Sequence, residues 1–297
     1  MLLSCILFIA ATIVGQWNVS YLQKKYQLSA GTGLGANVFY MIINGIVSAI
    51  IPAAVIWLRG GKIETTAYSV ALAIVIVISS AVNVICVFKA YEKGKIAVVN
   101  IISTTGSIIL SCIWGIVVFY ENISFRQGIA IFSMLAAVVL IMGKNSEKMN
   151  KKLLWIYVVA TLSAWCVTLL NKQHQIEAVY QTADTLSFSV WIGVARVILF
   201  TLFLPFVSIK KEKQKIECPA RTVGYAMLSS AIGGGAYVVT LFTMTTLPLI
   251  VVSPISSGIG MLINIIVPWL LCGEKLEKKQ IAGSIISIIG VLLFLWN

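Results

Sequence analysis

Several long stretches of this sequence contain no charged residue. One runs from Ile96 to Tyr120 and another from Leu247 to Gly273. A helix needs about 20 apolar residues to cross roughly 30 Å of hydrocarbon, and each stretch is longer than that. Because lipid offers no partner for backbone N–H and C=O groups, a spanning segment has to pair them internally, as a helix does. Both stretches therefore predict membrane-spanning helices.

The composition extends this prediction to the whole chain. Of its 297 residues, 59% are hydrophobic and 11% are charged, whereas about a quarter of the residues in a water-soluble domain are charged. Lipid is therefore the expected solvent, and the expected fold is an all-α polytopic membrane protein. The connections between the apolar segments are short, so no separate soluble domain is expected. Ten spans are predicted: 2–20, 34–58, 67–88, 96–119, 124–143, 153–171, 185–207, 222–243, 248–272 and 279–296.

The net charge of +12 would suggest nucleic acid as a partner for a soluble protein. Here the Lys and Arg residues lie almost entirely between the predicted spans, which is how membrane proteins are anchored and oriented. Nucleic-acid binding is therefore not expected. The six cysteines fall mostly inside or at the ends of apolar spans, and His174 is the only histidine. No disulfide framework, metal site or cofactor is predicted.

Residues 94–128 and 247–283 resemble each other at an offset of about 153 positions, which indicates an internal repeat. The matched positions carry serine, glutamate and glutamine in the same order: Ser103 with Ser256, Glu121 with Glu274, and Gln127 with Gln280. Pro52 and Pro205 extend the match to the second and seventh spans. We therefore expect two five-helix repeats, residues 1–143 and 153–297, joined by a cytoplasmic linker at 144–152.

The charges of the connections predict that the two repeats are inverted. Five is an odd number, so the second repeat must enter the membrane in the opposite sense. The odd-numbered connections hold about 17 Lys and Arg residues and the even-numbered ones about 4, and every matched pair of connections differs in this direction. The positive-inside rule then places the odd-numbered connections in the cytoplasm and both termini outside.

The short motifs that follow the fourth and ninth spans resemble a known family. In the second half, Gly273-Glu274 is followed by Gln280 and Gly283, and in the first half Tyr120-Glu121 is followed by Gln127-Gly128. Together with ten spans in two inverted halves, this pattern resembles the ten-helix, EamA-like branch of the drug/metabolite transporter superfamily. Tyr120 departs from the usual glycine. The resemblance covers nearly the whole chain and implies alternating-access transport of small organic solutes, with cytoplasmic termini, opposite to the loop charges.

Arg196 is the sharpest candidate for chemistry. It lies near the centre of the span 185–207, where an arginine costs about 2.5–3.5 kcal/mol on insertion scales. No Asp or Glu is expected at the middle of any span, and the repeat counterpart of Arg196 is about Ile43. One interpretation is an anchor for a carboxylate or phosphate, which the guanidinium binds in two-pronged fashion. The other is pairing with backbone carbonyls of broken helices or with an aromatic face such as Trp191.

Further polar and aromatic residues inside spans are candidates to contact a solute. Aromatic walls with a few amides suit small-molecule sites, although Ser, Thr and Asn also bond between helices and Trp often marks the membrane interface. Gly233-Gly234-Gly235 predicts either a hinge or close helix packing, and Glu121 and Glu274 are expected to cap helices or pair with loops. The candidate substrate-binding residues are Arg196, Trp17, Asn18, Tyr40, Asn44, Asn83, Asn100, Ser103, Trp165, Tyr237, Ser253, Ser256 and Ser257.

The function predicted from these features is secondary active transport of a small organic metabolite, anionic or zwitterionic, such as an amino acid. Translocation of a lipid or a lipid-linked sugar is an alternative. An intramembrane enzyme is a remote one, since no acid, base, nucleophile or metal set is seen at membrane depth. The missing mid-span carboxylate disfavours proton-coupled export of cationic drugs. We expect a multi-pass protein of the bacterial cytoplasmic membrane, a monomer or homodimer whose partners are its solute and membrane lipids, with the coupling ion open.

Overall fold

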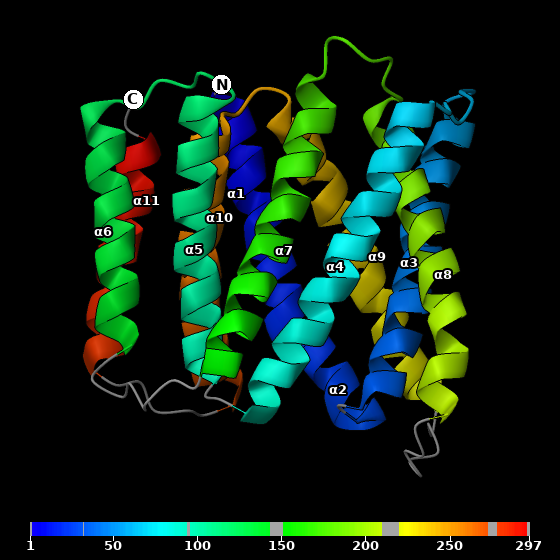
Figure 1. Ribbon diagram of the computed structural model, residues 1–297, viewed down its shortest axis with the longest axis horizontal. Helices are drawn as coiled ribbons and strands as arrows, with labels where there is room; N and C mark the ends of the chain where they lie inside the picture. Colours follow the sequence, from blue (N-terminus) through cyan, green and yellow to red (C-terminus); the bar gives the residue numbers. More distant parts are fainter. Residues whose placement is uncertain are drawn as a thin grey trace. The chain divides into compact units, whose positions relative to one another are not determined.

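A computed structural model describes residues 2–31, 33–93, 96–142, 151–209, 220–272 and 278–295. In these residues the regular secondary structure is entirely helical (Figure 1). The elements are α1 (Leu2–Trp17), a π-helical turn η1 (Asn18–Gln23), α2 (Lys24–Ala30), α3 (Leu34–Leu58), α4 (Ala67–Lys93), α5 (Ile96–Val117), α6 (Phe125–Met142), α7 (Lys151–Ile176), α8 (Thr185–Ile209), α9 (Ala220–Met244), α10 (Leu249–Cys272) and α11 (Lys278–Leu295).

The helices fall where the apolar segments predicted them, with two corrections. The first helix does not end near residue 20, because η1 joins α1 to α2 and the helix continues to Ala30. Lys24 and Lys25 therefore lie in a helix and not in a connection. Lys172 was also assigned to a connection but lies inside α7. In each case the prediction ended the span at the first polar residues, whereas the backbone continues the helix through them.

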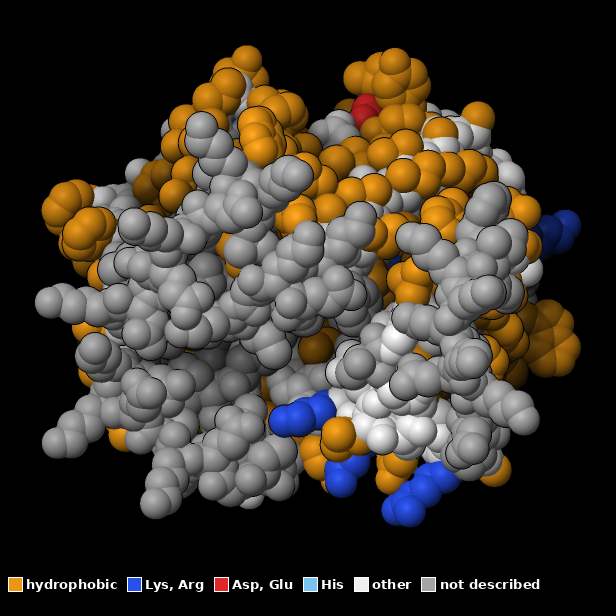
Figure 2. Space-filling model, turned by 60° about the horizontal axis from the view of Figure 1, so that its bottom comes forward, with side chains coloured by type: hydrophobic (Ala, Val, Ile, Leu, Met, Phe, Trp, Pro, Cys, Tyr) orange, Lys and Arg blue, Asp and Glu red, His pale blue; other side chains and the backbone are white. Residues whose placement is uncertain are grey.

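Six helices are long and apolar enough to cross a membrane, among the described residues. They are Leu2–Ala30, Leu34–Leu58, Ala67–Cys86, Trp155–Ile176, Thr185–Pro205 and Ala220–Met244. Large apolar side chains in them are exposed: Ile50 is 60% accessible and Leu202 is 65% accessible. On the face shown in Figure 2, the side chains that are coloured are mainly hydrophobic, with a few Lys and Arg side chains near its lower edge. Such apolar surface suits contact with lipid.

Side-chain caps explain where two of the helices begin. At the start of α6, Ser124 Oγ accepts the backbone N–H of Gln127 at 3.2 Å, and Gln127 Oε1 accepts the N–H of Ser124 at 3.0 Å. This reciprocal pair is a capping box, so the repeated glutamine has a structural role in the first half. At the start of α8, Asp184 accepts the N–H groups of Leu186 and Ser187. An aspartate there also complements the positive end of the helix dipole.

The chain divides into two compact units that do not follow the sequence halves. Unit 1 comprises Met1–Ile13, Ser79–Gln173 and Thr243–Asn297, and unit 2 comprises Val14–Ile78 and His174–Phe242. The boundaries fall inside α1, α4, α7 and α9. Each unit therefore combines helices from both predicted repeats.

In unit 2, α3 packs along α8, as Figure 1 shows at one side of the ribbon. Gly45 lies against Val197, whereas Ile56, nearer the end of α3, packs with Leu186 and Val190 near the start of α8. Residue numbers rise along one helix as they fall along the other, so the two helices are antiparallel.

Two glycines allow the backbones of α3 and α8 to approach closely. A Cβ atom on Gly193 would lie 2.7 Å from the backbone nitrogen of Ala49 and 2.8 Å from the carbonyl oxygen of Gly45. A Cβ atom on Gly45 would lie 2.8 Å from Val197 Cγ2. Small residues four positions apart are the usual means of close helix packing in membranes. The crossing point therefore depends on both glycines.

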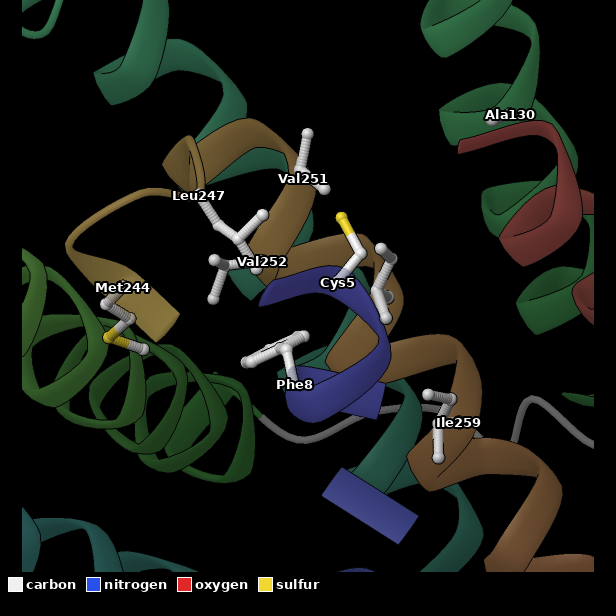
Figure 3. Close-up of a cluster of buried hydrophobic side chains, with 9 residues drawn as sticks. Cys5, Phe8, Ala130, Met244, Leu247, Val251, Val252 and Ile259 are labelled. Atoms are coloured by element: carbon white, nitrogen blue, oxygen red, sulfur yellow. The ribbon is translucent and has the colours of Figure 1, made fainter. Parts of the chain in front are cut away.

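In unit 1, α10 packs against α5 and α11, and α11 packs against α6. The hydrophobic core of this unit gathers around the start of α10 (Figure 3). Phe8 of α1 is 1% accessible, and Leu247 and Ile255 are fully buried. The core contains Cys5, Phe8, Ala130, Met244, Leu247, Val251, Val252, Ile255 and Ile259.

Three of the helix pairs in contact join counterparts of the predicted repeats. The partners α3 and α8, α5 and α10, and α6 and α11 stand at the same places in the two halves, as the second, fourth and fifth helices. Each pair lies within a single unit. Contact between an element and its own counterpart is expected where a pseudo-two-fold axis passes between them.

Candidate functional site

The π-helical turn η1 begins at Asn18, which is 2% accessible. Asn18 Nδ2 donates to the carbonyl oxygen of Ser229 on α9 at 3.0 Å. The amide reaches α9 because Gly233 has no side chain, since a Cβ atom there would lie 2.8 Å from Asn18 Nδ2. Single π-turns inside α-helices are frequent at functional sites. The other amide atom, Asn18 Oδ1, is buried and has no hydrogen-bond partner among the described residues.

Tyr40 of α3 joins the same network through its hydroxyl group. Gln23 Nε2 donates to Tyr40 Oη at 2.9 Å, and Tyr40 Oη shares a hydrogen bond with Ser229 Oγ at 2.8 Å. Ser229 therefore connects Asn18, through its carbonyl, with Tyr40, through its hydroxyl. All of these atoms belong to unit 2.

Arg196 lies in the interior of α8, as the sequence predicted. One Nη donates to Asn44 Oδ1 across the close α3–α8 crossing. Asn44 is within one position of the predicted counterpart of Arg196, so the contact joins nearly equivalent positions of the two repeats. The hydroxyl groups of Tyr40 and Tyr237 lie within electrostatic range of the guanidinium. We call Asn18, Tyr40, Asn44, Arg196, Ser229 and Tyr237 the Arg196 cluster.

The guanidinium of Arg196 has hydrogen-bond donors that the described residues do not all satisfy. Its Nε is buried and has no hydrogen-bond partner among the residues that the structure describes, and within those residues no carboxylate forms an ion pair with it. Trp191, considered as an aromatic partner, instead donates its indole N–H to the Glu64 carbonyl at 3.1 Å. The cluster thus offers a cationic donor at Arg196 and an acceptor at Asn18 Oδ1.

Several other candidates contact neighbouring residues of the protein, either across helices or along one helix. Asn83 Nδ2 donates to the Ala160 carbonyl at 2.7 Å, and Ser253 Oγ donates to the Ser107 carbonyl at 3.3 Å. Trp17, 36% accessible, stacks on Tyr21. The contacts of Asn83 and Ser253 fit the structural interpretation that the sequence left open, in which polar side chains bond between helices.

The remaining candidates lie in unit 1. Trp165 packs edge-to-face on Trp114, with ring centroids 5.4 Å apart. Ser256 and Ser257 are half-buried in α10. The side chains of Asn100 and Ser103 lie outside the described residues, as does Glu274.

Glu121 caps the start of α10, which confirms the capping interpretation for this residue. Its two carboxylate oxygens accept the backbone N–H groups of Leu249 at 2.7 Å and Ile250 at 2.9 Å. The chain turns at Tyr120, whose φ of 52° is left-handed, and glycine is the residue that adopts this conformation most readily. Gly115 leaves room for the carboxylate, because a Cβ atom there would lie 2.7 Å from Glu121 Oε2.

Lys172 is a functional candidate that sequence reasoning missed. It is 5% accessible, and its Nζ donates to the carbonyl oxygens of Met244 at 2.7 Å and Leu247 at 2.6 Å. The ammonium group thus neutralises the negative end of α9, while Glu121 neutralises the positive start of α10. The two groups also lie within electrostatic range of each other. Lys172 directly follows the predicted span 153–171, and nothing in the sequence signals that the helix continues through it.

Comparison with known proteins agrees with this architecture. Residues 150–296 match the EamA-like transporter family. Among curated proteins there is no match. One solved crystal structure aligns with a TM-score of 0.76 and 11% sequence identity, over 98% of this chain and 95% of that chain. At this identity the likeness shows the fold alone, and the family match carries the functional inference.

The family settles the class of protein. EamA-like proteins are transporters and not enzymes, and they span the membrane several times. Through residues 150–296 the chain belongs to the EamA-like transporter family of the drug/metabolite transporter superfamily, and it is a multi-pass integral membrane transporter.

Proposed function

We propose that this chain is a secondary active transporter that moves a small organic metabolite, anionic or zwitterionic, such as an amino acid, by alternating access. The observation that carries the proposal is Arg196, whose Nε is buried within α8 without a partner among the described residues. A buried charge is costly unless it is paired. A carboxylate of the solute would supply the partner that the described residues do not.

The proposal includes ten spanning helices in two inverted five-helix repeats. Contact between counterpart helices supports it, and so does the antiparallel course of α3 and α8. The solute-contacting residues proposed are Arg196 with Asn18, Tyr40, Asn44 and Tyr237, all of which belong to unit 2. A bacterial cytoplasmic membrane is the proposed location, and the coupling ion is left unassigned.

Arg196→Gln tests the anchor. Glutamine is polar but uncharged and shorter, so this substitution removes the guanidinium charge while keeping a side chain that can hydrogen-bond. Purified protein is heated with a panel of carboxylate metabolites, each matched by its amide. A carboxylate should stabilise the parent, and Arg196→Gln should bind it roughly 10- to 100-fold more weakly, since hydrogen bonds to charged groups contribute about 1.5–3 kcal/mol.

The control removes a different positive charge from the same unit. Arg221 is exposed and lies 5.9 Å from the Tyr225 ring, measured from its Cζ to the ring centroid. Arg221→Gln should retain parental stabilisation. Equal stabilisation of the parent and Arg196→Gln by every carboxylate that binds would remove Arg196 from solute recognition.

Translocation of a lipid or lipid-linked sugar is the second candidate. The same unpaired Nε favours it, because guanidinium binds phosphate as readily as carboxylate. In liposomes this function would appear as Arg196-dependent movement of a fluorescent phospholipid between leaflets. Absence of such movement, together with carboxylate-dependent stabilisation, would exclude lipid translocation and support the transport of a metabolite.

A further inference from the structure

A second group of unpartnered polar atoms lies in unit 1. It shares no residue with the Arg196 cluster. Ser111 is fully buried, and its hydroxyl has no hydrogen-bond partner among the described residues. The indole Nε1 atoms of Trp114 and Trp165 are likewise buried and without partners there. Each of these three groups can donate one hydrogen bond.

Trp114 links the other two residues of this group at the contact between α5 and α7. Ser111 and Trp114 are three residues apart on α5 and so share a helix face. Trp165 of α7 meets Trp114 edge-to-face, with an angle of 73° between the ring planes. The helices approach closely at Gly106, where a Cβ atom would lie 2.5 Å from Thr161 Cγ2. We call Ser111, Trp114 and Trp165 the donor triad.

The charged residues that come next along the chain after Trp114 and Trp165 already have partners. Glu121, seven residues after Trp114, accepts the N–H groups at the start of α10. Lys172, seven residues after Trp165, donates to two carbonyls at the end of α9 and just beyond it. Their opposite charges offset each other. The donor triad should therefore choose its ligand by how many hydrogen bonds the ligand can accept, and not by the ligand's net charge.

A water molecule is a poor partner for such a triad. It has two lone pairs for three donors, and its own two protons would need acceptors. A carboxylate offers about four acceptor positions and no proton. We infer that the donor triad binds an oxygen group that only accepts hydrogen bonds, such as a carboxylate or ester carbonyl. The inference rests on the proposed function, takes Trp165 from the candidates that the sequence predicts, and adds Ser111 and Trp114.

The oxygen group could come from a free solute or from the ester of a membrane lipid, and indole N–H resonances distinguish the two. The full-length protein carries ¹⁵N in its indole groups, with Trp114 and Trp165 assigned through Trp114→Phe and Trp165→Phe. If one of these variants fails to fold, the other still assigns one member of the pair. Spectra are recorded in dodecyl maltoside micelles with acetate or methylammonium at equal ionic strength, and in phosphatidylcholine nanodiscs without either.

Acetate should move the assigned indole N–H resonances downfield and saturate, and methylammonium should leave them in place. Downfield resonances in nanodiscs before acetate is added would identify a lipid ester as the acceptor. Trp191 is the internal control, since its N–H is already bonded to the Glu64 carbonyl. Ser111→Ala should raise the acetate concentration that gives half of the full indole shift by roughly threefold to tenfold. Ser133→Ala, whose hydroxyl bonds the Ile129 carbonyl, should leave it unchanged.

Resonances unmoved by both acetate and lipid, or moved equally by methylammonium, would overturn the donor triad. This failure differs from failure of the proposed function. An Arg196→Gln variant that keeps full carboxylate stabilisation would refute the anchor while leaving the indole shifts intact.

Discussion

At the residue scale, the charged groups of Arg196, Lys172 and Glu121 differ in whether the protein supplies them with hydrogen-bond partners. Lys172 and Glu121 are satisfied by helix ends, whereas Arg196 keeps a donor without a partner among the described residues. The sequence predicted the position of Arg196, because an arginine inside an apolar run is conspicuous. It did not predict the Asn44 partner, since the offset of 153 pointed to Ile43 and only the packed crossing shows which neighbour the guanidinium meets.

Lys172→Met should destabilise the protein by about 2–3 kcal/mol, because two charge-assisted hydrogen bonds to buried carbonyls are lost. The measurement is thermal unfolding in detergent. Lys62→Met is the matched control, since Lys62 is exposed in the connection between α3 and α4. Equal unfolding temperatures for Lys172→Met and Lys62→Met would show that the Lys172 contacts contribute nothing.

At the element scale, hydropathy located the helices but not their irregularities. The π-helical turn at Asn18–Gln23 and the continuation through Lys24 and Lys25 depend on contacts with α3 and α9 that no local pattern encodes. Gly233 was predicted either to be a hinge or to pack closely, and its contact with Asn18 supports close packing. The α3–α8 crossing likewise needs Gly193, which a single sequence shows only as one glycine among many.

Gly193→Ala should destabilise the α3–α8 pair by about 1–3 kcal/mol, because the added methyl meets backbone atoms that cannot turn aside. Thermal unfolding of Gly193→Ala is compared with that of Gly224→Ala in α9. Nothing lies within 4 Å of a Cβ atom on Gly224, and alanine favours a helix over glycine. Gly224→Ala should therefore be neutral or stabilising. A Gly193→Ala variant as stable as Gly224→Ala would contradict the close crossing.

At the scale of the whole molecule, three of the helix pairs in contact, α3 with α8, α5 with α10 and α6 with α11, join counterparts of the predicted duplication. The sequence supplied the correspondence of spans, but it did not predict that each compact unit draws helices from both repeats. That arrangement depends on contacts between residues about 150 positions apart, such as Arg196 with Asn44 and Ser253 with Ser107. Loop charges address a separate question, the direction in which the chain enters the membrane.

The charge distribution predicts that residues 144–152 face the cytoplasm and that both termini face outward. The measurement is the labelling of single cysteines, placed in the linker and at each end of a cysteine-free variant, by a membrane-impermeant maleimide in whole cells. Labelling of the termini but not of the linker is expected. The reverse pattern would favour the orientation that the family resemblance implies and would show that the loop charges do not set the topology.

The most direct test of the central claim is solute flux in proteoliposomes. The carboxylate identified by thermal stabilisation is radiolabelled and loaded on one side, and its movement is followed for the parent, Arg196→Gln and Arg221→Gln. We predict saturable flux for the parent and Arg221→Gln, and flux at least roughly tenfold lower for Arg196→Gln, in line with the loss of a charge-assisted contact. Equal flux through all three proteins, or none above empty liposomes for the parent, would contradict a transporter that recognises its solute through Arg196.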